Sequence, residues 1–241
     1  LDACCGRALE TGAFTRNQVV CTKTLYNYVN LGFMETRNHH LPEKLRRNTK
    51  AGKVRENKKK LGRSIEERPV EVNCREEFGH WEADLVIGQK SGNDQALLTL
   101  AERKTRQYWI IPIENREADS VIKAFQELQN VYSEHFADVF KSITTDNGSE
   151  FSRLSELEEL AGTLVYFTHP YSSCEKGTNE RHNGIIRRFI PKGKRISDFD
   201  IDEISNIELW CNNLPRKILG YRTPDEVFED ELDSIYSLHT A

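Results

Sequence analysis

The chain has 241 residues, of which 37% are hydrophobic and 30% are charged, and its formal net charge is −4. This length and composition are typical of a globular protein that buries one large core or two smaller ones. No stretch approaches the roughly 18 to 20 consecutive apolar residues of a membrane span, and the first thirty residues lack a signal-peptide pattern, so we expect a cytoplasmic protein with no membrane partner. The six cysteines show no Cys-x-x-Cys spacing, which favours reduced thiols over disulfides or a zinc finger.

Positive charge is concentrated in two segments. Residues 37–68 contain twelve Lys and Arg against four Asp and Glu, and residues 181–195 contain six Lys and Arg and no acid. Between them, residues 69–180 contain ten basic and twenty acidic residues. Basic segments beside an acidic centre suit a protein that binds a polyanion and concentrates cations at one point. We interpret the basic run at residues 50–63 both as a flexible linker and as a contact to DNA phosphates, and the contact residues expected in it are Lys58, Lys59 and Lys60.

The first 36 residues are predicted to form short helices. A helix start is expected at residues 15–20 and a second helix at residues 23–30, with a turn between them. Two short helices around a tight turn, with Lys23 on the outer face, resemble a DNA-binding helix-turn-helix. An ordinary helical hairpin has the same pattern.

Residues 80–113 change to the period of β-strands. Three strand-like runs are separated by a Gly/Ser/Asn/Asp turn and by a short basic turn, which predicts an antiparallel meander. Further on, the pattern predicts a helix, a strand that ends at Asp146, a helix, a strand and a helix. The expected strands are residues 80–87, 95–100, 107–113, 143–146 and 163–168, and the expected helices are residues 117–136, 152–161 and 180–189.

This order predicts an α/β fold of the ribonuclease-H-like type, with a mixed five-stranded sheet flanked by helices and preceded by a small helix-turn-helix-like segment. We expect three parts: a DNA-binding segment at residues 1–36, a basic linker at residues 37–70 and a catalytic domain at residues 71–235. Because the chain begins at Leu1 rather than Met, we also expect that an upstream piece is missing.

Three acids lie on three separate elements of this expected fold. Asp146 ends a strand before an Asn-Gly turn, Asp84 lies in the first strand, and Glu180 lies on a helix. Each acid alone is most simply interpreted as a charged surface residue. Three acids on three separate elements, however, predict a carboxylate cluster that binds metal. Rivals remain for these positions, because three other acids lie nearby in the chain: Glu82, Glu150 and Glu175.

Five ordered blocks between residues 15 and 230 resemble a known family, the DDE transposases of bacterial insertion sequences, specifically the insertion-sequence-thirty family, which is related to retroviral integrases. The blocks are residues 79–88, 98–106, 145–151, 177–193 and 213–228. The resemblance implies an integrase-type catalytic core. It also implies that a further DNA-binding region precedes this one in such transposases.

The resemblance places the catalytic and metal-binding triad on Asp84, Asp146 and Glu180, with two Mg²⁺ or Mn²⁺ ions. It implies that water makes the first cut in the DNA, and that the freed 3′-hydroxyl then attacks the target DNA. The expected partners are the ends of the element, the target DNA and further copies of the chain in the nucleoid. Two other functions remain open: an inactive fragment or regulator that only binds DNA, and a nuclease that hydrolyses without joining.

A basic stripe follows Glu180 along the expected helix and beyond it. Helical spacing places Asn183, Arg187 and Arg188 on or near the face of Glu180, where they could hold phosphates beside the scissile bond. Lys192 and Lys194 extend the stripe. The alternative is a solvated basic helix that contacts no DNA.

Overall fold

The computed structural model describes residues 1–41, 61–89, 94–169 and 173–238, except for the side chains of residues 173, 174, 178, 180 and 238. Contacts within the chain divide it into two units. One comprises Leu1–Arg55 with Leu214–Thr223, and the other comprises Glu56–Asn213 with Pro224–Ala241. Each unit is described by itself. None of the helices in the described residues combines the length and the apolar character needed to cross a bilayer.

The first unit contains two α-helices, α1 (Asp2–Glu10) and α2 (Thr22–Leu31), and the short helical turns η1 (Asn38–His40) and η8 (Lys217–Leu219). Gly6 of α1 packs directly against the ring of Tyr221, and a Cβ at this position would lie 2.1 Å from that ring. Only glycine lets α1 approach this closely. Arg7 also donates a hydrogen bond to the carbonyl oxygen of Tyr221 at 3.4 Å.

The prediction of a helix-turn-helix is wrong for its first helix. The second helix forms as expected, as α2, but residues 15–20 form a turn instead of a helix start. The Gln18 side chain accepts hydrogen bonds from both the backbone N–H and the hydroxyl of Thr15, each at 2.9 Å. This capping contact occurs, but β-branched Val19 and Val20 follow at once and disfavour propagation of a helix.

The second unit contains the predicted mixed five-stranded sheet. Its strands are β1 (His80–Ile87), β2 (Ala96–Glu102), β3 (Tyr108–Ile113), β4 (Ser142–Thr145) and β5 (Leu164–Phe167), in the order β3-β2-β1-β4-β5. β1, β2 and β3 form the antiparallel meander, while β4 and β5 run parallel to β1. This topology is that of the ribonuclease-H-like fold, as predicted.

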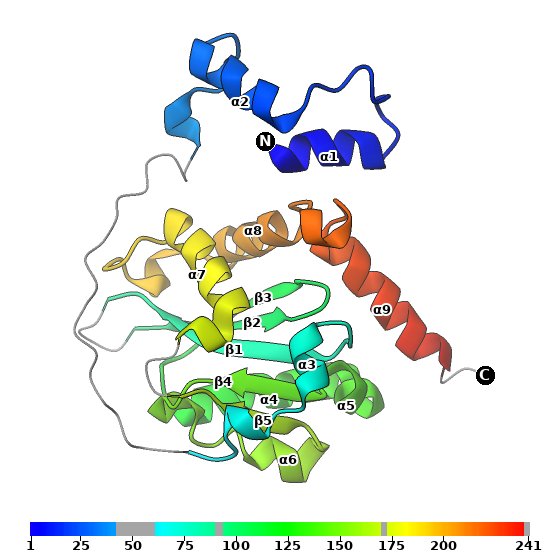
Figure 1. The fold of residues 1–241 in the computed structure, drawn as a ribbon. Coiled ribbons are helices and arrows are strands. Elements are labelled where there is room, and N and C mark those ends of the chain that lie inside the picture. The colour runs from blue at the N-terminus through cyan, green and yellow to red at the C-terminus, as the bar shows by residue number, and fades with distance from the viewer. Residues whose placement is uncertain (42–60, 90–93, 170–172, 239–241) are drawn as a thin grey trace. The chain divides into compact units, whose positions relative to one another are not determined.

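Helices cover both faces of the sheet. They are α3 (Val70–Cys74), α4 (Ala118–Tyr132), α5 (Phe136–Val139), α6 (Glu156–Ala161), α7 (Gly177–Phe189), α8 (Ile201–Asn212) and α9 (Pro224–Leu238). Figure 1 shows α7 crossing in front of the strands and α4 lying behind them. The helix predicted from residue 152 begins only at Glu156, since a 3-10 turn, η5 (Ser149–Phe151), is followed by four turn residues, 152–155.

The alternation of side chains along β1 produces two separate cores. Trp81 and Ala83 are fully buried on the face covered by α4, α5 and α9, where Trp81 lies in an aromatic cluster with Trp109, as expected of core aromatics. Val86 lies on the other face, against apolar residues of α7 and α8. Asp84 has the same parity as Val86, so it faces α7.

Both edges of the sheet are covered, which prevents pairing with foreign strands. At the β3 edge, Asn212 of α8 pairs with the backbone N–H and C=O of Tyr108 at 2.9 and 2.8 Å, and Glu208 accepts the N–H of Ile110. At the β5 edge, the backbone N–H of Phe167 donates to Arg63 at 2.8 Å. The described end of the predicted linker, residues 61–68, therefore packs along the sheet.

Candidate active site

Asp84 and Asp146 are brought together by the parallel pairing of β1 and β4. The register pairs Glu82 with Thr144, and continuing it by two residues sets Asp84 beside Asp146. Neighbouring strands lie about 4.8 Å apart, which is close enough for the two carboxylates to share a ligand. Two of the three predicted acids thus lie side by side, although 62 residues separate them in the chain.

The turn after β4 orients the Asp146 carboxylate. Its Oδ1 accepts the backbone N–H of Gly148 at 2.9 Å, which is the hydrogen bond of an Asx turn. Asn147 secures the same turn, because its amide donates to the carbonyl of Thr168 at 2.5 Å and accepts the N–H of Leu61 at 3.2 Å. The predicted Asn-Gly turn is present and leaves Oδ2 of Asp146 directed into the site.

A buried lysine that the sequence analysis did not single out lies between the two acids. Nζ of Lys176 is 3.2 Å from Oδ1 of Asp84 and 3.3 Å from Oδ2 of Asp146, and it also donates to the carbonyl of Ala83 at 3.3 Å. Lys176 is only 6% exposed. Its place one helical turn before Glu180 was the signal in the sequence that could have identified it.

The electrostatics of the site follow from this crowding of charge. Burial raises the pKa of the Asp84 carboxyl, the nearby charge of Asp146 raises it further, and the Lys176 ammonium opposes both effects. The charges of Asp84 and Asp146 also act on Glu150. Burial raises the pKa of the Glu150 carboxyl, and the charges of Asp146 and Asp84 raise it further. The site is therefore a partly buried pair of carboxylates that favours a cation.

Two asparagines one turn apart attach α7 to the sheet above Asp84. Nδ2 of Asn183 donates to Oδ2 of Asp84 at 2.7 Å, while Oδ1 of Asn183 accepts the hydroxyl of Tyr108, also at 2.7 Å. Asn179 is fully buried, and its amide donates to the carbonyl of Glu82 at 3.0 Å. Glu180 lies between these two asparagines on α7, although its side chain is outside the described residues.

Two of the three rival acids, Glu82 and Glu175, are engaged with other partners. Glu82 is fully buried, forms an ion pair with Arg103 at 2.5 Å and accepts the backbone N–H of Asn179 at 3.0 Å. Glu175 accepts hydrogen bonds from both the backbone and the ring of His169, each at 2.8 Å. Both carboxylates are thus occupied in holding backbone or neighbouring side chains. Glu150 is the rival that stays in the electrostatic neighbourhood of the site.

The side chains at this position fit a hard divalent cation. Oδ1 of Asp84 and Oδ2 of Asp146 already converge on one cationic group, the Lys176 ammonium, and carboxylate oxygens are the ligands that Mg²⁺ and Mn²⁺ prefer. Among the side chains that the structure describes, no group of three or more metal-ligating residues occurs. The Glu180 side chain lies outside that set.

Comparison with known proteins places the two aspartates within a matched domain. Residues 75–173 match the integrase core domain family, a range that includes Asp84 and Asp146. The chain is 43% identical to a probable transposase for the insertion-like sequence element IS1161 of Streptococcus salivarius, over 88% of this chain and 59% of that protein. It is 35% identical to the transposase InsI for insertion sequence element IS30A of Escherichia coli (strain K12), over 70% of this chain and 42% of that protein. The integrase core match and these sequence relatives support a DDE transposase of the IS30 family.

The match to these IS30-family relatives is partial in length. The chain spans about half of the curated transposases that it resembles, as the shares of 59% and 42% show. In the solved structures, the catalytic core domain of BIV integrase aligns with a TM-score of 0.48 at 18% identity, over 66% of this chain and 98% of that one. The family assignment therefore rests on the sequence relatives and on the integrase core match.

The residues on and after α7 that were predicted to bind DNA divide into two groups. Asn183 and Arg187 point toward the sheet, where Arg187 donates to the carbonyl of Ile87 at 2.7 Å. Arg188, Lys192 and Lys194 are exposed, and the Arg188 guanidinium lies 5.4 Å from the ring centre of Trp210.

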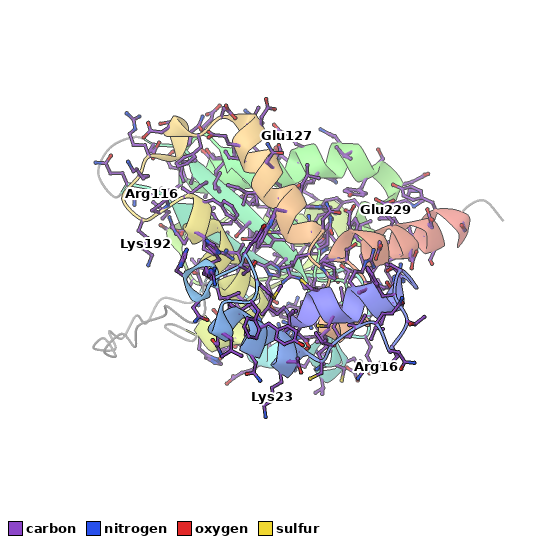
Figure 2. All side chains as sticks on the ribbon, turned by 90° about the horizontal axis from the view of Figure 1, so that it is seen from above. Arg16, Lys23, Arg116, Glu127, Lys192 and Glu229 are labelled. Atoms are coloured by element: carbon purple, nitrogen blue, oxygen red, sulfur yellow. The ribbon has the colours of Figure 1, made fainter. Side chains whose placement is uncertain are left out.

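The remaining predicted contacts lie on the first unit or outside the described residues. Figure 2 shows the side chain of Lys23 pointing outward from α2 and that of Lys192 pointing outward beyond the end of α7. Both are exposed to solvent. Three further predicted contacts, Lys58, Lys59 and Lys60, lie outside the described residues.

Proposed function

We propose that this chain is the catalytic part of a transposase that cuts DNA strands and joins them to a target. The observation that carries the proposal is the convergence of the Asp84 and Asp146 carboxylates on one cation position, 3.2 and 3.3 Å from the same ammonium. The family assignment supports a polynucleotidyl transferase. A carboxylate pair on adjacent parallel strands matches the need of phosphodiester chemistry for localised positive charge.

In this proposal Asp84, Asp146 and Glu180 hold two Mg²⁺ or Mn²⁺ ions. When bound, such a pair of ions stabilises negative charge on the attacking and leaving oxygens of an in-line displacement at phosphorus. The oxygens of Asp84 and Asp146 that face Lys176 would be the ones to hold the ions. Glu180 lies on the first turn of α7, the helix that Asn183 attaches to Asp84.

The neighbouring residues orient the acids. Asn183 holds Oδ2 of Asp84, and the N–H of Gly148 holds Oδ1 of Asp146, so each carboxylate has one oxygen held by the protein and the other directed inward. Such hydrogen bonds fix ligand orientation, and losing them in metal sites costs about 10- to 100-fold in activity or affinity. Glu82 holds the backbone of α7 next to Glu180. This arrangement supports a preorganised site.

We further propose that exposed basic residues hold the DNA of the element ends and of the target. Arg188, Lys192 and Lys194 follow Glu180 along the chain and are exposed, so they can contact phosphates close to the reacting bond. In the same proposal residues 1–36, including Lys23, also contact DNA, and residues 37–70 connect that segment to the catalytic domain at residues 71–235. Joining two ends at one target also calls for more than one copy of the chain.

The test uses the full chain and labelled DNA that carries the ends of the element. With Mg²⁺ or Mn²⁺ we expect both a nicked product and a product in which the labelled end is joined to target DNA. Asp84→Asn and Asp146→Asn should give neither product while retaining DNA binding, because they lose charge and keep size. Nicking without joining would point to a nuclease. DNA binding with neither product in the unaltered chain would reduce the proposal to a DNA-binding protein.

A further inference from the structure

We propose that Lys176 is a built-in counter-ion, which holds Asp84 and Asp146 together before a divalent cation binds and leaves their oxygens when the cation arrives. This inference rests on the proposed metal-dependent function of the same site. It assigns a role to a residue that lies between the acids but belongs to neither the predicted triad nor the predicted DNA contacts. The role follows from how the two carboxylates share their hydrogen bonds.

Each acid has one oxygen held by the protein frame and one held by Lys176. In Asp84, Oδ2 accepts from Asn183 at 2.7 Å and Oδ1 accepts from Lys176 at 3.2 Å. In Asp146, Oδ1 accepts from the N–H of Gly148 at 2.9 Å and Oδ2 accepts from Lys176 at 3.3 Å. The two oxygens that a cation would take are therefore the two that the ammonium now occupies.

The ammonium is fully engaged in this position. An ammonium has three N–H donors, and Nζ of Lys176 has three acceptors, the third being the carbonyl of Ala83 at 3.3 Å. The Lys176 side chain is 7% exposed, against 27% for Asp84 and 45% for Asp146. Lys176 thus lies beneath the carboxylates, and it offsets the repulsion between two acids that would otherwise face each other across adjacent strands.

A divalent ion and the ammonium cannot both use these oxygens. Mg²⁺ binds oxygen at about 2.0 to 2.1 Å and demands near-octahedral geometry, so it needs the space directly in front of the carboxylates. Two cations there would also repel each other. The Lys176 ammonium can move away from the carboxylates, because a lysine charge is carried on a flexible four-carbon chain that has no fixed geometry. Lys176 immediately precedes α7, so its withdrawal takes place next to the helix turn that carries Glu180.

The first experiment measures the accessibility of Lys176 in the unaltered chain. The full chain is treated with an amine-acylating reagent, with and without Mg²⁺, and modification of each lysine is followed by mass spectrometry. We expect acylation of Lys176 to be slow without the ion and severalfold faster with it. Lys123, whose side chain is 63% exposed, should be equally reactive in both conditions. The Asp84→Asn variant should show no response of Lys176 to Mg²⁺.

The second experiment measures metal binding directly by calorimetry with Mn²⁺. Removing the competing charge in Lys176→Met should tighten Mn²⁺ binding by about tenfold or more. An opposite charge at this distance weakens proton binding to a carboxylate by about 10-fold or more, and the ammonium competes with a metal cation for the same oxygens. Lys176→Arg, which keeps the charge, should stay much closer to the unaltered chain. Weaker or unchanged Mn²⁺ binding by a folded Lys176→Met variant would overturn the proposal.

The two proposals fail in distinguishable ways. If the unaltered chain binds Mn²⁺ while the reactivity of Lys176 stays constant, the counter-ion role is wrong and the metal-dependent function stands. If the unaltered chain binds neither Mg²⁺ nor Mn²⁺, even with DNA present, both proposals fall. Faster acylation of Lys176 upon metal binding, together with tighter binding by Lys176→Met, supports both.

Discussion

Glu82 accepts the backbone N–H of Asn179 at 3.0 Å, so the first strand of the sheet holds the residue immediately before Glu180. The same carboxylate forms a buried ion pair with Arg103 at 2.5 Å. A buried charge with two such partners keeps one orientation, because any other would leave it unsatisfied. The position of Glu180 thus depends on Glu82. This residue lies on the same face of β1 as Asp84, but it holds the backbone of α7.

Breaking this pair should destabilise the protein strongly. Glu82→Gln leaves the Arg103 guanidinium buried without its counter-charge, which costs about 3 to 5 kcal/mol of unfolding free energy. Urea unfolding of the variant measures the loss. Exchanging both residues, as Glu82→Gln with Arg103→Met, should recover much of it because no unpaired charge remains.

An exposed ion pair provides the matched control. Arg63 and Glu158 lie 3.3 Å apart with side chains 39% and 28% exposed, so Glu158→Gln should cost no more than about 1 kcal/mol through that pair. A Glu82→Gln variant as stable as Glu158→Gln would show that the buried pair does not hold this part of the fold.

Glu180→Gln should separate catalysis from binding. The change keeps the size of the side chain and removes its charge, so cleavage and joining should fall by at least about 100-fold, since even outer partners of metal ligands are worth that much. DNA affinity, measured by fluorescence anisotropy, should be retained or rise. Because the three acids act as one unit, combining Glu180→Gln with Asp84→Asn should be hardly worse than either change alone.

Glu175→Gln tests the assignment of the third acid. Glu175 is engaged with His169, and the variant should retain most of the cutting and joining activity. A fully active Glu180→Gln beside an inactive Glu175→Gln would mean that the triad has to be rebuilt around Glu175.

Glu208 should make stability depend on pH. Burial raises the pKa of its carboxyl from 4.5 to about 7. Between these two values the folded chain keeps a proton that the unfolded chain releases, so the free energy of unfolding falls as pH rises from 4.5 to about 7. The shift corresponds to at most about 3 kcal/mol, and partial solvation of Glu208 reduces the expected loss to about 2 kcal/mol.

The matched variant is Glu208→Gln, which keeps an oxygen that can accept the N–H of Ile110 and cannot titrate. Urea unfolding at about pH 5 and about pH 8 should show a smaller loss of stability for the variant than for the unaltered chain. Equal losses in both proteins would assign the pH dependence to other groups.

DNA affinity should depend steeply on salt through the exposed basic residues. If Lys192 and Lys194 each neutralise one phosphate of duplex DNA, replacing both with Ala should reduce the slope of log affinity against log salt by about 1.8. Titrations between about 50 and 200 mM salt measure the slope. Lys104, which pairs with Glu231 at 2.7 Å, is the control, and Lys104→Ala should leave the slope nearly unchanged.

The same measurement applies to the basic run at Lys58, Lys59 and Lys60. Replacing all three with Ala should flatten the slope by about 2.7 if each contacts a phosphate. An unchanged slope would remove this segment from the DNA interface and leave it as a linker only.

Much of the fold and two of the candidate acids could be predicted from local patterns. The strand period from residue 80 to residue 113 and the β-branched run before Asp146 predicted β1 to β4 closely, because alternation and turn residues act over a few neighbours. The Asn-Gly turn after Asp146 was predicted for the same reason. Local signals were less reliable at residues 15–20, where the capping contact of Thr15 formed without the helix.

The sequence by itself determined the order of the elements, the resemblance to DDE transposases and the strand that carries each aspartate. Only the tertiary structure decided which charges meet. Lys176 reaches Asp84 and Asp146, Asn183 reaches Asp84, and Arg103 reaches Glu82 across sequence separations of 92, 30, 99 and 21 residues. Such contacts follow from the pairing of β1 with β4 and from the packing of α7 on the sheet, and the periodicity within any one element carries no information about either.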